Sequence, residues 1–155
     1  MYFALPMKIS IATISKRGNA SGPTGHLTAA YVERCQRFAS CSLRSFASEG
    51  KLLEFLDGSA GRTRPALILA DSRGQQVTSE ELAAAVGAIQ DAGTQLLVFA
   101  IGPADGWSPE ALARADRTIA FGRITLPHEL AALVLAEQIY RALTIRAGHP
   151  YHSGH

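Results

Sequence analysis

Apolar runs separated by turn residues divide the chain into short and long units that alternate. Five segments are rich enough in apolar and β-branched residues to form strands: residues 8–14, 42–46, 65–70, 95–101 and 117–121. Two of them, 65–70 and 95–101, are continuous apolar runs typical of strands buried on both faces. Helical patterns lie between them at 26–39, 49–56, 78–91 and from 108 onward. A strand–helix order repeated about five times predicts an α/β fold, with a single parallel sheet between helices.

Two helix starts carry specific capping signals. Thr78 is followed three residues later by Glu81, which is a capping box. Ser108 precedes Pro109, and this order suits a capping serine before the first helical turn. Both signals predict where the helices that cover the sheet begin.

The last helix, residues 127–146, is unusual because no polar residue occurs from Leu130 to Ala136. A helix that is apolar on every face is buried on several sides. Glu129, Glu137 and Arg141 interrupt the run well short of the roughly 18 apolar residues of a membrane span. We therefore expect this helix to be buried partly by its own domain and partly by another chain.

Composition and charge add few constraints. The chain has 155 residues, 47% of them hydrophobic and 18% charged, which suits one soluble globular domain. The net charge is +2, but residues 1–64 hold nine Lys/Arg against four Asp/Glu, and the remainder holds six against nine. A basic N-terminal half either faces an anionic partner or is only an uneven surface.

The cysteines and the N-terminus indicate a cytoplasmic protein. Cys35 and Cys41 have neither zinc-ligand spacing nor a small disulfide-rich context, so reduced thiols and no metal are expected. The chain shows neither a signal peptide nor a membrane span. Residues 1–6 precede a second methionine, Met7, and are interpreted as a short extension or an early start codon.

Candidate chemistry is expected where strands end, because ligands of open α/β sheets bind beyond the carboxyl ends of the strands. Three glycine-containing loops follow predicted strands, at 70–74, 102–106 and 121–126. The loop at 15–25 is also glycine-rich and is either a flexible connection or a contact for ligand or RNA. The sequence has no P-loop, dinucleotide fingerprint, metal-ligand cluster or nucleophile elbow.

The end of the chain is rich in groups that stack and exchange protons. Gly148 and Pro150 are typical of a helix stop, and His149, Tyr151 and His152 surround them. This segment is either a frayed tail or part of a site.

Three short motifs follow one another in the C-terminal part of the chain. They are Thr-Leu-Pro-His at 125–128, Glu-Gln-Ile-Tyr-Arg-Ala at 137–142 and His-Pro-Tyr-His at 149–152. This pattern resembles the C-terminus of the bacterial ribosomal RNA large subunit methyltransferase H family. These are small SPOUT-class methyltransferases that act on N3 of a pseudouridine in 23S rRNA. The resemblance begins at Met7 and is strongest from about Ile101 onward.

The resemblance implies a SPOUT domain over 7–155, with a C-terminal trefoil knot around S-adenosylmethionine. It also implies a homodimer in which the tail of the second subunit completes the pocket, and 23S rRNA of the assembled ribosome as substrate. Carried over by position, the cofactor contacts are Ala70, Gly102, Phe121, Gly122, Arg123, Ile124, Thr125 and Leu126.

The matching positions for catalysis are His128, Arg141, Tyr151 and His152. Methylation at N3 requires removal of the N3 proton and an in-line approach to the sulfonium methyl group. On the resemblance, Tyr151 and His152 are assigned to base positioning and proton transfer. Arg141 is assigned to contact with the uracil anion or a phosphate.

The sequence shows four departures from the family pattern. Pro103 stands where a second glycine is usual, Ala70 replaces a strand-end leucine, and Ile119 to Gly122 with Arg123 replaces Ser-Leu-Ser. Ala132 replaces an arginine. These changes leave two alternatives open: a related SPOUT methyltransferase with another RNA target, and a non-catalytic dimeric protein that binds RNA or the ribosome.

Overall fold

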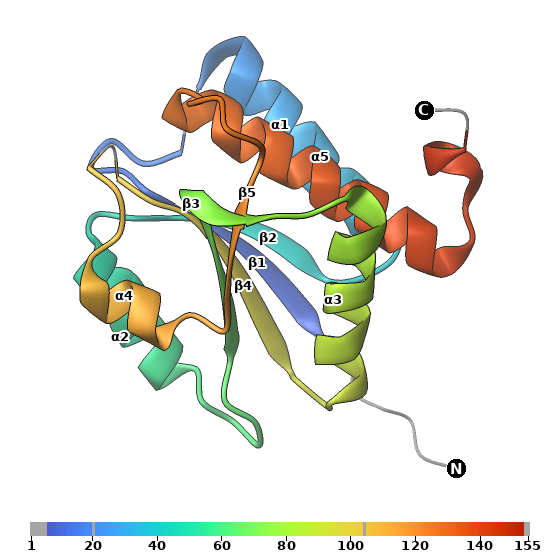
Figure 1. Ribbon diagram of the computed structural model, residues 1–155, viewed down its shortest axis with the longest axis horizontal. Coiled ribbons are helices and arrows are strands. Elements are labelled where there is room, and N and C mark those ends of the chain that lie inside the picture. Colours follow the sequence, from blue (N-terminus) through green and yellow to red (C-terminus); the bar gives the residue numbers. More distant parts are fainter. Residues whose placement is uncertain (1–5, 20, 104, 154–155) are drawn as a thin grey trace.

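A five-stranded parallel sheet forms the centre of the computed structural model, which describes residues 6–19, 21–103 and 105–153 (Figure 1). The strands lie in the order β2-β1-β4-β3-β5, and all four neighbouring pairs are parallel. Their bounds are β1 (Lys8–Ile14), β2 (Cys41–Phe46), β3 (Ala66–Gln76), β4 (Leu96–Ile101) and β5 (Arg117–Ala120). The predicted α/β fold with one parallel sheet is confirmed.

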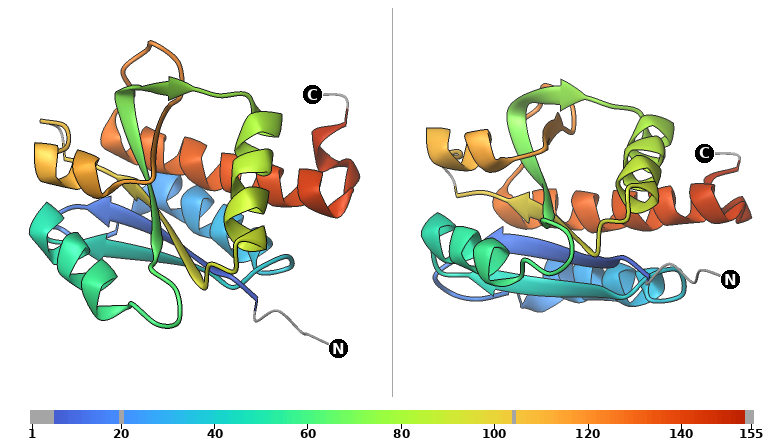
Figure 2. Two further views of the ribbon diagram at one scale, coloured as in Figure 1. Left: turned by 60° about the horizontal axis from the view of Figure 1, so that its bottom comes forward. Right: turned by 90° about the horizontal axis from the view of Figure 1, so that it is seen from below.

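Helices cover both faces of this sheet (Figure 2). One face packs against α1 (Gly22–Cys35), α3 (Ser79–Asp91) and α5 (His128–Ala147). The other face packs against α2 (Glu49–Gly58) and α4 (Pro109–Arg114). A short 3-10 helix, η1 (Pro150–His152), follows α5 and packs against it.

Alternation along the central strands builds two separate cores. In β4, Leu97, Phe99 and Ile101 point into the α1/α3/α5 core, and Val98 and Ala100 point into the α2/α4 core. The continuous apolar run therefore serves both faces, as the sequence predicted.

Helix ends follow their local chemistry. Thr78 and Glu81 form the predicted capping box of α3, and the Ser108 hydroxyl caps α4. α5 ends at Gly148 with φ of 70°, a left-handed conformation that glycine adopts without strain. Pro127 is the N-cap of α5, one residue outside its predicted position in the first turn.

The first helix begins and ends four residues earlier than predicted. α1 starts at Gly22, because Pro23 suits the first turn. The chain leaves the helix after Cys35 because the Gln36 side chain accepts a hydrogen bond from the Cys41 backbone N–H at 3.1 Å and donates to the Cys41 carbonyl.

The predicted loop at 70–74 is wrong, since β3 continues through it to Gln76. An irregularity between Ala70 and Gln75 allows the strand to pair again with β5, where Gln75 is opposite Ile119. At Gly74 a Cβ atom would lie 2.8 Å from the Ile119 carbonyl carbon, so this close strand approach requires glycine.

Three expectations concern features outside the sheet. Within the described residues, no helix is long and apolar enough to span a membrane, and no group of three His, Cys, Asp or Glu side chains is arranged to hold a metal. The trefoil knot stays a prediction, because strand order alone does not define the threading of the chain. The proposed N-terminal extension, residues 1–6, lies outside the described residues except for Pro6.

Candidate active site

A cavity of about 320 Å³ lies where β4 and β5 end and β3 is irregular. This volume is in the range of small-molecule sites. Seven of the eight predicted cofactor residues line it: Ala70, Gly102, Phe121, Gly122, Ile124, Thr125 and Leu126. The eighth, Arg123, is exposed and is not part of the wall. The structure thus brings together segments that are far apart in sequence, from Ala70 to Leu126.

Trp107 forms a wall of this cavity that sequence reasoning missed. Its indole Nε1 donates a hydrogen bond to the Ala70 carbonyl at 2.9 Å, and the residue is only 5% exposed. At Gly102, a Cβ atom would lie 2.6 Å from Cε2 of this ring. Gly102 therefore admits the indole, and the isolated tryptophan after a glycine-rich turn was the available sequence signal.

Asp71 places a carboxylate at the same cavity. Its side chain is 6% exposed and accepts hydrogen bonds from the Arg73 backbone N–H at 2.8 Å and from the Arg73 Nε at 3.3 Å. Burial acts to raise the pKa of Asp71, but these hydrogen bonds outweigh it and lower the pKa below its usual value. Asp71 therefore remains negatively charged at neutral pH.

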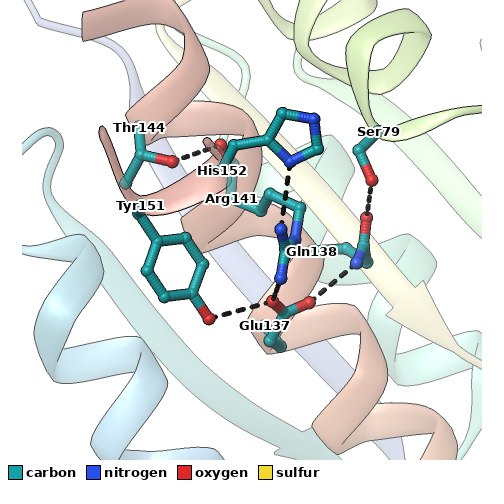
Figure 3. Close-up of polar contacts among 7 residues, drawn as sticks. All are labelled: Ser79, Glu137, Gln138, Arg141, Thr144, Tyr151 and His152. Carbon is teal, nitrogen blue, oxygen red and sulfur yellow. Dashed lines mark hydrogen bonds and ion pairs between the residues drawn. The ribbon is translucent and has the colours of Figure 1, made fainter. Parts of the chain in front are cut away.

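The four predicted catalytic residues fall into two places. His128 lines the cavity at the first residue of α5, whereas Arg141 lies near the other end of that helix. Thirteen residues of α-helix separate them, which is about 20 Å. Tyr151 and His152 lie in η1, beside Arg141 (Figure 3).

Glu137 joins the distal residues into what we call the tail cluster: Glu137, Arg141, Tyr151 and His152 (Figure 3). Glu137 Oε1 accepts from Arg141 Nη2 at 2.6 Å, from Arg141 Nε at 3.0 Å and from the Tyr151 hydroxyl at 3.0 Å. Arg141 Nη1 lies 3.0 Å from His152 Nδ1. One carboxylate therefore fixes the arginine and the tyrosine together.

Two elements outside the tail support this cluster. Gln138 donates to Glu137 Oε2 at 2.7 Å and accepts from the Ser79 hydroxyl at 2.7 Å. The ring of His152 also reaches α3, where its Nε2 lies 2.6 Å from Glu80 Oε1. This contact with His152 lowers the pKa of Glu80. The tail is thus held against α3 as well as α5.

Tyr151 keeps its proton in this environment. Burial raises the pKa of the phenol, and hydrogen bonding with Tyr31 and with Glu137 raises it further. The Arg141 guanidinium also lies 4.9 Å from the centre of the Tyr151 ring. The phenol is therefore suited to donate a hydrogen bond rather than to act as an ionised base.

Glu137 was not among the predicted site residues, although it begins the motif at 137–142. Its spacing of four residues from Arg141 was the available signal for an ion pair on one helix face. The contact with Tyr151 had no local signal, since it requires the turn at Gly148 to bring η1 back onto α5.

Comparison with known proteins agrees with this fold. The family model described as a predicted SPOUT methyltransferase matches residues 7–152. Among solved structures, the SpoU methyltransferase AviRb from Streptomyces viridochromogenes, in complex with AdoMet, has a TM-score of 0.51 at 12% identity. The match covers 94% of this chain and 62% of that one, so this chain spans less than two thirds of its length. A probable methylase family protein from Haemophilus influenzae has a TM-score of 0.56 at 10% identity, covering 96% of this chain and 71% of that one.

The family model therefore places the chain in the SPOUT methyltransferase class, and the fold agrees with it. Two relatives indicate which family within this class the chain belongs to. Both are named ribosomal RNA large subunit methyltransferase H. The one from Koribacter versatilis is 47% identical over 96% of this chain and 100% of its own length. The one from Mesorhizobium japonicum is 36% identical over 94% and 99%. The chain belongs to the ribosomal RNA large subunit methyltransferase H family.

Proposed function

We propose that this protein is an S-adenosylmethionine-dependent methyltransferase that acts as a homodimer on 23S rRNA of the assembled ribosome. Its product would be N3-methylpseudouridine. The observation that carries the proposal is the cavity at the strand ends, lined by seven residues at the family's cofactor positions. The 47% identical relative, named for methylation of large-subunit RNA, supports the choice of substrate.

The residues around the cavity fit the proposed cofactor. Ile101, Trp107 and Leu126 give apolar walls for an adenine ring, and Gly102 allows the Trp107 indole to take its place in that wall. The ionised Asp71 suits the positive charge of a sulfonium or an amino group. When bound, S-adenosylmethionine supplies the methyl group that is transferred.

A second subunit is required because the tail cluster lies about 20 Å from His128 along α5. In a twofold dimer, the tail of each subunit would reach the cavity of its partner. The described part of the chain leaves large apolar side chains exposed at Leu27, Ile124 and Leu130, with Ile124 78% exposed. Such side chains are expected at an obligate interface.

The tail cluster would then act on the pseudouridine. The N3 proton passes to a base, for which His152 is the candidate once Arg141 turns from its Nδ1 to the uracil ring, and the N3 lone pair forms the new bond to the methyl carbon. The bond from that carbon to sulfur breaks, and sulfur keeps the electron pair. Arg141 would stabilise the negative charge that develops on the ring. Tyr151, whose hydroxyl proton is donated to Glu137, would help to position the base. Glu137 would be a positioning residue, since it holds Arg141 and Tyr151.

The test is to incubate the protein with methyl-labelled S-adenosylmethionine and ribosomes that lack the modification, and then to map the labelled nucleotide. Label at N3 of the pseudouridine in the intersubunit stem-loop is the expected result. Label elsewhere would mean that the enzyme has another RNA target. A folded dimer that labels nothing would favour a binding protein without transfer chemistry.

A further inference from the structure

Both ring nitrogens of His152 have a partner, and the two partners are of opposite chemical kinds. Nδ1 lies 3.0 Å from Arg141 Nη1, and Nε2 lies 2.6 Å from Glu80 Oε1. A guanidinium can only donate hydrogen bonds, and an ionised carboxylate can only accept them. The neutral imidazole of His152 therefore carries its hydrogen on Nε2 and has a free lone pair on Nδ1.

Glu80 is placed and charged for this contact. It lies in the first turn of α3, where the helix dipole favours a negative charge. That turn is fixed by its capping box and by Ser79, whose hydroxyl donates to Gln138 of α5 at 2.7 Å. The hydrogen bond with His152 holds the pKa of Glu80 below its usual value. The carboxylate is therefore ionised at neutral pH and accepts from Nε2–H.

We propose that Glu80 is a positioning residue for the methyl transfer, which fixes the ring of His152 in the tautomer that has its lone pair on Nδ1. This inference rests on the proposed function and deepens it. When Arg141 turns to the uracil ring, the bond from Nε2 to Glu80 remains and keeps the imidazole in place. A carboxylate bonded to a histidine has this effect in other proton-transfer sites. Glu80 and His152 belong to one subunit, so they would reach the cavity of the partner subunit together.

The charges around His152 favour the proton transfer in this arrangement. The bond between N3 and its hydrogen breaks, and the proton forms a new bond to Nδ1. The imidazolium that results lies 2.6 Å from the negative charge of Glu80, which stabilises it. Arg141 has moved to the uracil ring and no longer opposes that charge, while Glu137 and the neutral Tyr151 add no positive charge. The side chain of His152 is 27% exposed, so the proton can later pass to water.

The first test is the tautomer of His152, measured by nitrogen NMR of the full chain with isotope-labelled histidines and without RNA. The signals of His152 are identified by their loss in His152→Ala. At a pH where the ring is neutral, we expect a bare Nδ1 and a protonated Nε2 in the unmodified protein. Glu80→Gln replaces the carboxylate with an amide, which can also donate to Nε2, so the signals should shift toward the opposite tautomer.

Glu110→Gln is the matched control. Glu110 is also an exposed carboxylate in the first turn of a helix, but that helix, α4, packs on the other face of the sheet. The control should leave the tautomer of His152 unchanged. A protonated Nδ1 in the unmodified protein, or the same tautomer in Glu80→Gln, would overturn the proposal.

Methyl transfer to ribosomes gives the second test. Glu80→Gln should lower kcat about tenfold at an unchanged KM for S-adenosylmethionine, because proton transfer contributes roughly 10²–10⁴-fold and the variant keeps the imidazole. Glutamine can still bond to His152, so limited proteolysis near Arg146 should cut this variant no sooner than the unmodified protein. A loss of kcat with faster cutting and an unchanged tautomer would mean that Glu80 only holds the tail, which would overturn the proposal.

The two tests separate this inference from the proposed function. A bare Nδ1 that depends on Glu80, in a protein that labels no ribosomal RNA, would support the pairing of Glu80 with His152 and contradict the methyl transfer. Labelling of ribosomes at the same rate by Glu80→Gln and the unmodified protein would contradict the role of Glu80 and leave the methyl transfer standing.

Discussion

At Gly102 the main chain lies against the indole of Trp107, and a methyl group there would overlap the ring. Gly102→Ala must move Trp107 and break its hydrogen bond to the Ala70 carbonyl. We expect affinity for S-adenosylmethionine to fall about tenfold or more, which calorimetry would measure. Gly50→Ala is the control, because the nearest atom to its added Cβ is 3.8 Å away. Equal cofactor affinity in the two variants would contradict the role of Gly102.

The lowered pKa of Asp71 predicts that its contribution to the free energy of unfolding depends on pH. Its folded-state pKa is lowered, so its stabilisation is fully present above the ordinary carboxyl pKa of about 4 and is lost as pH falls through the folded value. Asp71→Asn should therefore reduce the free energy of unfolding by up to about 1 kcal/mol at neutral pH. The difference should shrink in acid, as urea unfolding at several pH values would show.

The control for this effect is Asp91→Asn. Asp91 is an exposed carboxylate at the end of α3 and makes no ion pair within the described part of the chain. A difference between Asp71→Asn and the unmodified protein that grows as the pH falls would contradict the argument.

At the scale of elements, Glu137 holds η1 against α5 through Tyr151 and Arg141. Glu137→Ala would leave both side chains without this acceptor and loosen the tail. We expect kcat to fall more than about tenfold with little change in the KM for S-adenosylmethionine, because the cofactor cavity is unchanged. Limited proteolysis should also cut sooner in the tail, near Arg146. Glu54→Ala, an exposed carboxylate of α2, should change neither measurement.

Elements with a strong local signal were predicted closely, and those set by distant contacts were not. The apolar runs of β1 and β4 and the capping box of α3 gave bounds within a residue or two, since burial and capping are local. The extension of β3 through 71–76 was missed because its polar residues are typical of turns, and pairing with β5 overrides them.

The residues of the candidate site also fall into a predicted group and a group that the sequence did not indicate. Cofactor positions came from a family pattern, and the structure brings seven of the eight to one cavity. Trp107 and Glu137 were missed because their roles depend on contacts with Ala70 and Tyr151, across 37 and 14 residues of sequence. Hydropathy carries no information about such side-chain contacts.

At the scale of the whole molecule, the separation of His128 from the tail cluster predicts complementation between subunits. In the proposed dimer, a tail variant, His152→Ala, and a cavity variant, Gly102→Ala, should each have low activity when both subunits carry the same change, provided that S-adenosylmethionine is kept well below its Kd for Gly102→Ala. Mixed dimers would contain one intact site made of the cavity of one subunit and the tail of the other. After subunit exchange, the mixture should recover about a quarter of the unmodified activity, measured as label transferred to ribosomes.

The control for complementation is a mixture of His152→Ala with Tyr151→Phe. Both changes lie in the tail, so no mixed dimer has an intact tail and activity should stay low. No recovery with Gly102→Ala in a mixture shown to exchange would mean that the site lies within one subunit. Recovery in the control mixture would mean that the tails of both subunits enter one site, which would also contradict the proposed arrangement.

The strand order has a further consequence for how the chain reaches this structure. β1 and β4 are neighbours in the sheet, and Lys8 is opposite Leu96. The centre of the sheet can therefore form only after these two distant segments of the chain have paired. Closing loops of that length makes folding slow compared with that of helical bundles. Until then the apolar segment Leu96–Ile101 is exposed in a partly folded chain, where it can associate with other copies. Recovery of the protein from denaturant is therefore set by competition between sheet closure and aggregation, and dilute, slow refolding favours the native state.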